Sequence, residues 1–248
     1  MAQSGFITYE SDYYHLLERL EVKSGTLSNE FHDNVKPFES RAIARFLDVL
    51  VDTGLSKVDR WSLSYLKTDN WAYIQDSSIG NGKPFLNYLF KKKSDFYQVE
   101  NEEFDIHVSP IFHFGGGNNF GDPGTQGQFV NTRGIRINGS VGNKIGFYTD
   151  FTENQSSTPF YVKEFYKEYG AFPFSGYTRI IGLDETKLGI DFMQATGYIA
   201  FKPSKKFNLR FGHSKNFIGS GVRSMILSDF SAPYLNLIMN VKLGRLEY

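Results

Sequence analysis

An alternation of apolar and polar residues with a period of two runs through the second half of the chain and limits its fold more than any other feature. Residues 207–212 and 235–243 place apolar side chains at every second position, with Ile238 as the exception. This period predicts β-strands with one face in apolar surroundings and the other against polar groups. Residues 214–233, between these strands, are too long for a hairpin turn and too rich in Lys, Asn, Gly and Ser for a plain linker. The sequence therefore predicts strand, polar loop, strand.

The same period predicts four further strands upstream. The longest is Phe104–Phe114, and its eleven residues are about the length that crosses a membrane as a tilted strand. The others are residues 135–141, 145–151 and 191–201. Gly142 and Asn143 supply the tight turn that predicts a hairpin between the first two of these.

The connections between the predicted strands alternate in length. The long ones are residues 115–128, 155–188 and 214–233, and the short ones are residues 142–143 and 203–206. Outer-membrane β-barrels have short turns on the periplasmic side and long loops outside, so the alternation favours an antiparallel barrel of this kind. A soluble β-sandwich with unequal loops is the alternative, but it does not predict a strict alternation.

The number of strands bears on whether such a barrel would be complete. Six strands are predicted in residues 101–248, whereas single-chain outer-membrane barrels start at about eight. An open edge in lipid leaves backbone donors and acceptors unpaired. The expectation is therefore an incomplete, N-terminal portion of a barrel, or one part of a multi-chain barrel.

Residues 1–100 show helical rather than strand periodicity. The clearest helix is predicted over residues 40–53, where Ile43, Phe46 and Leu47 begin an i, i+3, i+4 pattern that Gly54 ends. A shorter helix is predicted to end near Gly25. The overall fold class is thus α+β, mainly β, with an N-terminal helical region before the barrel strands. An ordinary small helical domain is the alternative for residues 1–100.

A third helix is predicted to begin with a capping box. Ser56 and Asp59 have the spacing at which each side chain caps the backbone of the other. Along this helix Val58, Trp61 and Tyr65 are predicted to form one apolar face.

Composition excludes several classes of function. The chain has 27 basic and 27 acidic residues, so it lacks the basic excess of a nucleic-acid-binding protein. The absence of Cys excludes disulfides and thiolate metal sites. An aromatic content of 17% with a mean hydropathy of -0.36 is typical of transmembrane barrels, whose strands are half polar. No run of apolar residues approaches the roughly 18 of a membrane helix.

Export to an outer membrane needs a signal peptide, and residues 1–4 do not resemble one. We therefore expect that these residues begin a mature form, with outer-membrane location.

No motif predicts an enzyme, a cofactor or a metal site. His107 and His113 lie on the polar face of a predicted strand without a carboxylate-rich motif beside them, which favours ordinary polar residues facing the inside of a barrel. No Ser, His and Asp order and no carboxylate pair stands in a recognisable catalytic frame.

Aromatic and charged residues gather in residues 160–179. Tyr161, Tyr166 and Arg179 are candidate polysaccharide-binding residues here, because aromatic faces beside charged groups suit sugar rings. Two alternatives remain: a helix packed on the barrel, with Tyr161, Phe165 and Tyr169 at i, i+4 and i+8, or part of the aromatic girdle at the membrane interface.

The connection over residues 214–233 supplies three more candidate polysaccharide-binding residues, Lys215, Arg223 and Asp229. We predict that Arg223 and Asp229 pair and fold the connection back over the barrel mouth, near the aromatic segment that holds Arg179. Such a pair would reduce the cost of ordering a 20-residue loop when it binds.

Several runs resemble a known family of outer-membrane proteins. They include GHSKNFIGSGVRSMILSDFSAPY (residues 212–234), HDNVKPFESRAIARFL (residues 32–47), DRWSLSYLKTDNW (residues 59–71) and KIGFYTDFTENQ (residues 144–155). Together with shorter runs they resemble the Wzi-type capsule assembly family, and especially the RemB-like gliding motility proteins. The sequence departs from the expected pattern at Val222 and in residues 170–179.

The resemblance implies a helical bundle at the periplasmic end of an outer-membrane barrel. It also implies a non-enzymatic role in capsule or exopolysaccharide assembly, or in attachment of polysaccharide to the surface, linked to gliding. The expected partners are surface polysaccharide and outer-membrane lipid, with proteins of a motility or secretion complex as a further class. A porin, or a protein-binding component of such a complex, is the alternative function.

Overall fold

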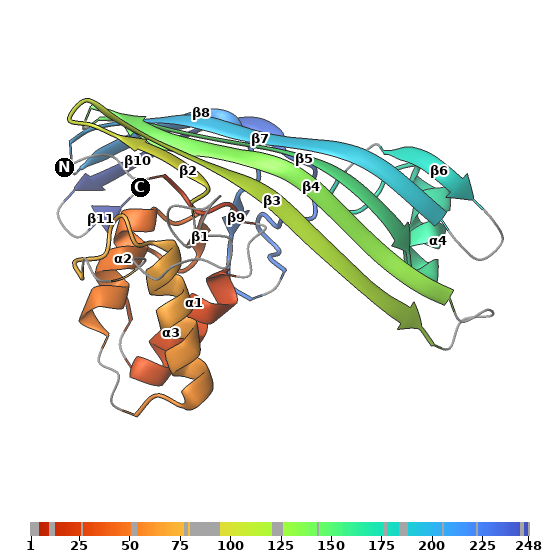
Figure 1. Ribbon diagram of the computed structural model, residues 1–248, viewed down its shortest axis with the longest axis horizontal. Helices are drawn as coiled ribbons and strands as arrows, with labels where there is room; N and C mark the ends of the chain where they lie inside the picture. Colours follow the sequence, from red (N-terminus) through yellow and green to blue (C-terminus); the bar gives the residue numbers. More distant parts are fainter. Residues whose placement is uncertain are drawn as a thin grey trace.

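Three helices near the start of the chain lie beneath a large curved sheet built from the rest of it (Figure 1). The computed structural model describes residues 5–9, 13–25, 27–50, 54–76, 79, 95–120, 126–142, 144–175, 178–183, 188–204, 206–221, 223–243 and 246–247. None of the helices in these ranges is long and apolar enough to cross a membrane.

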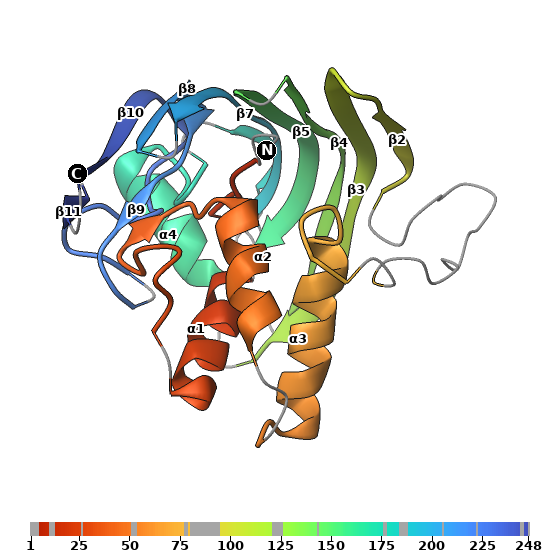
Figure 2. The same ribbon diagram turned by 90° about the vertical axis from the view of Figure 1, so that its left-hand side faces the viewer.

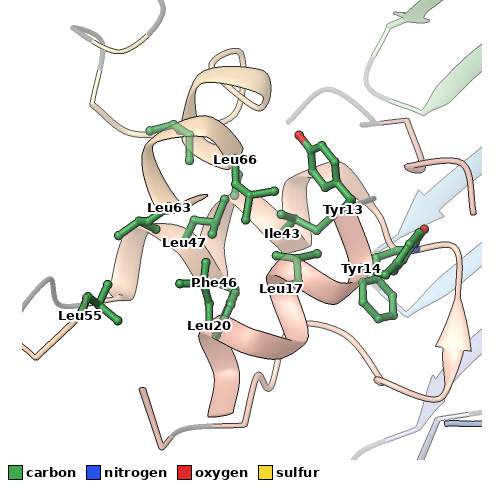
Figure 3. Close-up of a cluster of buried hydrophobic side chains, with 13 residues drawn as sticks. Tyr13, Tyr14, Leu17, Leu20, Ile43, Phe46, Leu47, Leu55, Leu63 and Leu66 are labelled. Atoms are coloured by element: carbon green, nitrogen blue, oxygen red, sulfur yellow. The ribbon is translucent and has the colours of Figure 1, made fainter. Parts of the chain in front are cut away.

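The three helices form one apolar core. They are α1 (Tyr13–Ser24), α2 (Ser40–Val49) and α3 (Lys57–Asp69). Leu17 and Leu20 of α1, Ile43 and Leu47 of α2 and Leu66 of α3 are at most 1% exposed and point toward one another (Figure 3). Their spacing of three or four residues places each set on one side of its helix, so three apolar stripes meet in the middle.

The helix ends agree with the predictions in part. Helix α1 ends at Ser24 and is followed by Gly25 with φ of 67°, as expected of a glycine C-cap. The prediction that α2 extends to residue 53 is wrong for Leu50, which is extended at φ -69° and ψ 124°. Leu50 packs against the helical core from this extended backbone. Residues 51–53 lie outside the described residues.

The capping box at the start of α3 is confirmed. The hydroxyl of Ser56 accepts a hydrogen bond from the backbone N–H of Asp59, and the Asp59 carboxylate accepts one from the backbone N–H of Ser56. Asp59 also accepts from Arg19 of α1 at 2.6 Å. The cap therefore also ties α3 to α1.

The predicted apolar face of α3 is exposed and is not the face that packs on the helical core. Val58, Trp61 and Tyr65 have exposed fractions of 65%, 66% and 44%. The buried side chains are instead Asp59, Ser62, Leu63 and Leu66. Asp59 and Ser62 satisfy their polar atoms within the helix and its cap, so this mixed face can be buried while the more apolar one is left outside.

The second layer is an antiparallel sheet in the order β11-β10-β8-β7-β5-β4-β3-β2, with β6 paired to β7. Its strands are β2 (Tyr97–Glu100), β3 (Phe104–Asn119), β4 (Gln126–Val141), β5 (Ile145–Thr158), β6 (Arg179–Leu183), β7 (Leu188–Ser204), β8 (Phe207–Ser214), β10 (Tyr234–Leu243) and β11 (Leu246–Glu247). A second sheet pairs β1 (Val35–Lys36) with β9 (Phe217–Ile218). Helix α4 (Phe160–Tyr169) follows β5.

The fold class α+β, mainly β, is confirmed, and all six predicted strands are present. The expected long loop over residues 115–128 is mostly strand, because Gly115 to Gly117 continue the ladder of β3 opposite Val130 to Gln128 of β4. Glycine is common in loops, but it also fits an extended ladder, so the Gly-rich composition does not separate the two. Residues 121–125 lie outside the described residues. The short strands β1, β2, β6, β9 and β11 were not predicted.

The sheet curves into an arch over the helices (Figure 2). Register places opposite residues on one face, so each row of the sheet can be assigned to the concave side, toward the helices, or to the convex side. The concave rows are largely polar; one contains Ser109, Arg136, Asp150 and Thr196. The convex rows are largely apolar; one contains Phe104, Val141, Ile145, Phe201, Leu209 and Met239. In the part of the chain that is described, β2 and β11 end the sheet path, each with one neighbour.

The two sides of α3 give a direct test of the helical core. We expect Leu66→Ala to lower the free energy of unfolding by about 2–5 kcal/mol, because it leaves a cavity at a fully buried site. The matched control Trp61→Ala, on the exposed side, is expected to cost less than about 1 kcal/mol. Denaturant unfolding of the full chain, followed by far-UV circular dichroism, measures both; a larger cost for Trp61→Ala would contradict the arrangement of α3.

Candidate functional site

The connection between β8 and β10 folds to the concave side of the sheet and joins the helical region there. Within it, β9 pairs with β1, with Val35 opposite Ile218 and Lys36 opposite Phe217. The backbone N–H of Gly219 then donates to the carbonyl of Asn34 at 2.8 Å. The start of the connection is therefore fixed to residues between α1 and α2.

A buried lysine strengthens this junction. Lys36 is 3% exposed and pairs with Glu18 of α1. Its ammonium lies 5.2 Å from the ring centroids of both Tyr14 and Phe217 and 6.0 Å from that of Tyr9. A desolvated cation over aromatic rings is worth about 2 kcal/mol or more, so Lys36 is an anchor for β9.

The middle of the connection is compact as well. Ile218 and Leu227 exchange two backbone hydrogen bonds, of 2.9 and 3.3 Å, and the Ser224 hydroxyl donates to the Ile218 carbonyl. Gly219 has φ of 137°, and a Cβ there would meet Ser224 Oγ at 2.1 Å. Only glycine fits both the backbone angle and the space.

The predicted pair of Arg223 and Asp229 is confirmed. Arg223 Nη1 lies 3.3 Å from Asp229 Oδ1, with side chains that are 52% and 18% exposed. A pair this exposed contributes about 1 kcal/mol or less, so its main effect is to orient the guanidinium. Burial raises the pKa of nearby Tyr9, and the Asp229 carboxylate adds to that rise, whereas Arg223 lowers it.

Residues 160–169 of the predicted aromatic segment form helix α4, so the helical part of that alternative is confirmed, but Tyr161 and Tyr169 are not on its packed side. The helix ends at Gly170, with φ of 65°, in a glycine C-cap. Its inner side packs on the concave face of β7 through a cluster of Val162, Tyr166, Phe172, Ile180, Ile190 and Phe192. Tyr166 stacks on Phe172 at 4.6 Å and is therefore a packing residue, whereas Tyr161 and Tyr169 are 72% and 61% exposed.

The aromatic segment and the connection meet at two phenylalanines. The rings of Phe174 and Phe230 lie 5.4 Å apart at 65°, and the Phe174 N–H donates to the Phe230 carbonyl at 3.0 Å. Phe230 also meets Phe165 of α4 edge to face at 5.8 Å. Phe174 has φ of 70°, a strained backbone for a bulky residue that the surrounding contacts hold in place.

Two cations complete this meeting point. Arg223 lies 4.9 Å and Lys215 5.8 Å from the ring centroid of Phe174. We call Phe174, Phe230, Lys215, Arg223 and Asp229 the cation-aromatic cluster. It offers an exposed guanidinium, a carboxylate and ring edges within one small area, a combination suited to hydrogen bonding and stacking with a polar ring.

The structure brings together three of the six candidate residues, Lys215, Arg223 and Asp229. Tyr161 is exposed on α4, and Arg179 begins β6, opposite Asp191 of β7. Sequence reasoning gave no individual role to Phe174, and it missed Phe230. A lone Phe in a polar loop carries no signal of a contact made 56 residues away.

His107 lies on the concave face, as expected, and two carboxylates lie beside it, of which the sequence pattern gave no sign. Its Nδ1 is 2.9 Å from Asp95 Oδ2 and its Nε2 is 3.4 Å from Asp105 Oδ2. Trp71 Nε1 also donates to Asp95, at 3.0 Å. No group of three or more potential metal ligands occurs in the described ranges. His107 and Asp95 therefore join the sheet to Trp71, which follows α3.

Comparison with protein-family models, with curated proteins and with solved structures gives no match to this chain.

Phe230 can be tested as the link between the two segments. Phe230→Ala removes two aromatic contacts worth about 0.5–1.5 kcal/mol each, so amide exchange in residues 223–231 is expected to accelerate about tenfold. Met225→Ala is the control, because Met225 is fully exposed in the same connection. Hydrogen exchange of the full chain measures this, and equal exchange in both variants would show that the contact does not order the connection.

Proposed function

We propose that the sheet is part of the wall of a transmembrane β-barrel in an outer membrane, with its convex face toward lipid. The support is an extended apolar surface on that face, where many large side chains are 40–70% exposed. They include Phe112, Phe114, Ile135, Val141, Ile145, Phe151, Met193, Ile199, Phe201, Phe211, Leu235, Leu237, Met239 and Leu243. Soluble monomers rarely expose contiguous apolar patches of more than a few hundred Å².

The height of this apolar band fits a bilayer. Phe104 and Phe114 are ten residues apart on β3, which corresponds to about 34 Å along the strand. A tilt of about 40° reduces this to about 26 Å, close to the roughly 25 Å apolar band of outer-membrane barrels. On β4 and β5 the convex row of Phe112 contains Arg133 and Glu153, whose charges pair with each other at 2.9 Å.

The concave face would then face the inside of the barrel. Polar residues there meet the helical region rather than a second apolar layer; for example, the Tyr198 hydroxyl donates to the Phe6 carbonyl at 3.0 Å. The proposal requires that further strands, from this chain or from another copy, pair with β2 and β11, because open edges in lipid cost several kcal/mol for each unpaired group.

If the convex face contacts lipid, an added charge should reduce assembly when it is placed on the convex face of β10 but not when it is placed on the concave face. Leu237→Arg places a charge on the convex face and is expected to cost about 2–4 kcal/mol near the membrane midplane, which reduces assembly into the outer membrane. Asn240→Arg, on the concave face of the same strand, is expected to assemble normally. The amount of protein in isolated outer membranes measures this, and equal assembly of both variants would rule out a lipid-facing convex side.

Within this barrel, we propose a non-enzymatic role in holding surface polysaccharide, as part of capsule or exopolysaccharide assembly or of attachment during gliding. The observation that supports it most is the cation-aromatic cluster, in which Arg223 is held over Phe174 by packing and by Asp229. A preformed surface of this kind loses less conformational entropy on binding than a mobile loop does.

The polysaccharide role is tested by Arg223→Ala, which removes the exposed cation of the cluster. Cells with this variant are expected to retain at least severalfold less surface polysaccharide at an unchanged level of outer-membrane protein. Lys57→Ala, an exposed cation on α3, is the matched control. Normal retention with Arg223→Ala would contradict the proposal; ion conductance would then favour a porin, and co-purified motility or secretion proteins a complex component.

A further inference from the structure

A cavity of about 540 Å³ lies between residues 29–45 and the ends of β7, β8 and β10, apart from the cation-aromatic cluster. Its volume is in the range of about 300–1,000 Å³ that holds small-molecule ligands. Its charged lining comprises the basic residues Lys36, Arg45, Lys202, Lys206, Arg210 and Lys242 and the acidic residues Glu30 and Glu39, besides His32. The cavity is therefore net positive, although the whole chain has no net charge.

Both acidic side chains of the lining are already paired. Glu30 pairs with Arg45 and Glu39 with Lys202, each at 2.5 Å. The positive charge of Arg210 is not balanced in this way, since no described carboxylate lies within ion-pair distance of it. The excess positive charge in the cavity thus includes Arg210, which lies on the side of the cavity that the sheet forms.

Arg210 is buried to an unusual degree for a charged residue. It is 3% exposed, and its guanidinium lies 4.9 Å from the Phe6 ring and 5.7 Å from the Tyr198 ring. It donates from Nη2 to Asn216 Oδ1, but its Nε has no hydrogen-bond acceptor among the described residues. Buried polar groups normally have partners, and Arg210 is one of the residues that line the cavity, so an acceptor bound there can pair with this guanidinium.

Asn208, two residues before Arg210 on the same face of β8, offers a hydrogen-bond acceptor beside the arginine donor. Asn208 also lines the cavity, and its Oδ1 is buried without a donor from the described residues. Asn240, directly opposite Asn208 on β10, adds a second amide. An anion with neighbouring hydroxyl groups would satisfy the arginine and the amides together, and the rings of Phe31 and Phe207 supply apolar lining beside them.

We infer that this cavity binds an acidic sugar unit, such as a uronic acid residue of a polysaccharide, with the carboxylate at Arg210 and the hydroxyls at the asparagines. This rests on the proposed polysaccharide role and adds a ligand class and a second site to it. A lipid headgroup fits less well, because the cavity opens on the polar concave face, and acyl chains would have no apolar surface there comparable to the convex one.

The inference is tested by binding of galacturonate oligomers to the purified full chain in detergent, with neutral galactose oligomers as the comparison. Lys206→Gln combined with Lys242→Gln removes two exposed cations at the rim and is expected to raise the dissociation constant about tenfold, from a few-fold for each exposed charge. Lys144→Gln is the matched control, since Lys144 is exposed at the same end of the sheet but outside the cavity.

A second variant examines the buried cation itself. Arg210→Gln removes the charge that faces the carboxylate and is expected to weaken binding roughly 10–100-fold, as for loss of a charge-assisted hydrogen bond. Its circular dichroism is compared with that of the unsubstituted chain, and the Lys206 and Lys242 variant keeps the test valid if Arg210→Gln fails to fold. Unchanged binding by the doubly substituted chain would overturn the inference.

The remaining outcomes separate this site from its alternatives. Equal affinity for galacturonate and neutral oligomers would overturn the acidic-sugar assignment. Displacement of the oligomer by inorganic phosphate or by phospholipid at the same concentrations would do so as well, and would indicate a phosphate or lipid site. The effect of Arg223→Ala on the polysaccharide that cells retain tests the proposed function separately, because Arg223 does not line this cavity.

Discussion

The polar side chains on the concave face of the sheet need partners, and the rest of the structure is arranged to supply them. Residues 5–9 cross this face, where the Tyr198 hydroxyl accepts from the backbone of Phe6 at 2.5 Å and donates back at 3.0 Å. Lys202 pairs with Glu39 next to α2. Each of these groups would be costly to bury without a partner. The helical region is therefore part of what makes a sheet with a polar inner face stable.

Period-two alternation predicted the six main strands and the difference between their faces, because it reflects the pleat directly. It did not predict the strands of two to five residues, which are too short to show a period and depend on partners far along the chain: β1 and β9 pair across about 180 residues. On α3, apolar residues alone gave the wrong face, because Asp59 and Ser62 are buried with their hydrogen bonds made. Patterns of hydrophobicity fail where polar atoms are satisfied locally.

In the candidate site, too, the local contacts were predictable from the sequence and the contacts between distant segments were not. The pairing of Arg223 with Asp229 was predictable, since opposite charges six residues apart in a folded loop have few other partners. The role of Phe174 was not, because it depends on a left-handed backbone and on contacts with Phe230, Arg223 and Lys215, which come from a different connection. Helical spacing predicted α4, but it did not predict that Val162 and Tyr166 would pack on β7 while Tyr161 stays exposed.

The connection between β8 and β10 links two regions that the sheet otherwise keeps apart. At one end β9 is held by β1 and by Lys36 in its aromatic surroundings, and at the other Phe230 is held by α4 and Phe174. A displacement of the helical region would therefore be transmitted to the cation-aromatic cluster through a short, hydrogen-bonded segment rather than through a free loop. Asn216, just before β9, also accepts from Arg210 at the cavity. If both proposed sites bind polysaccharide, this segment gives them a shared and rigid support, so ordering it once in folding lowers the entropic cost of binding at either site.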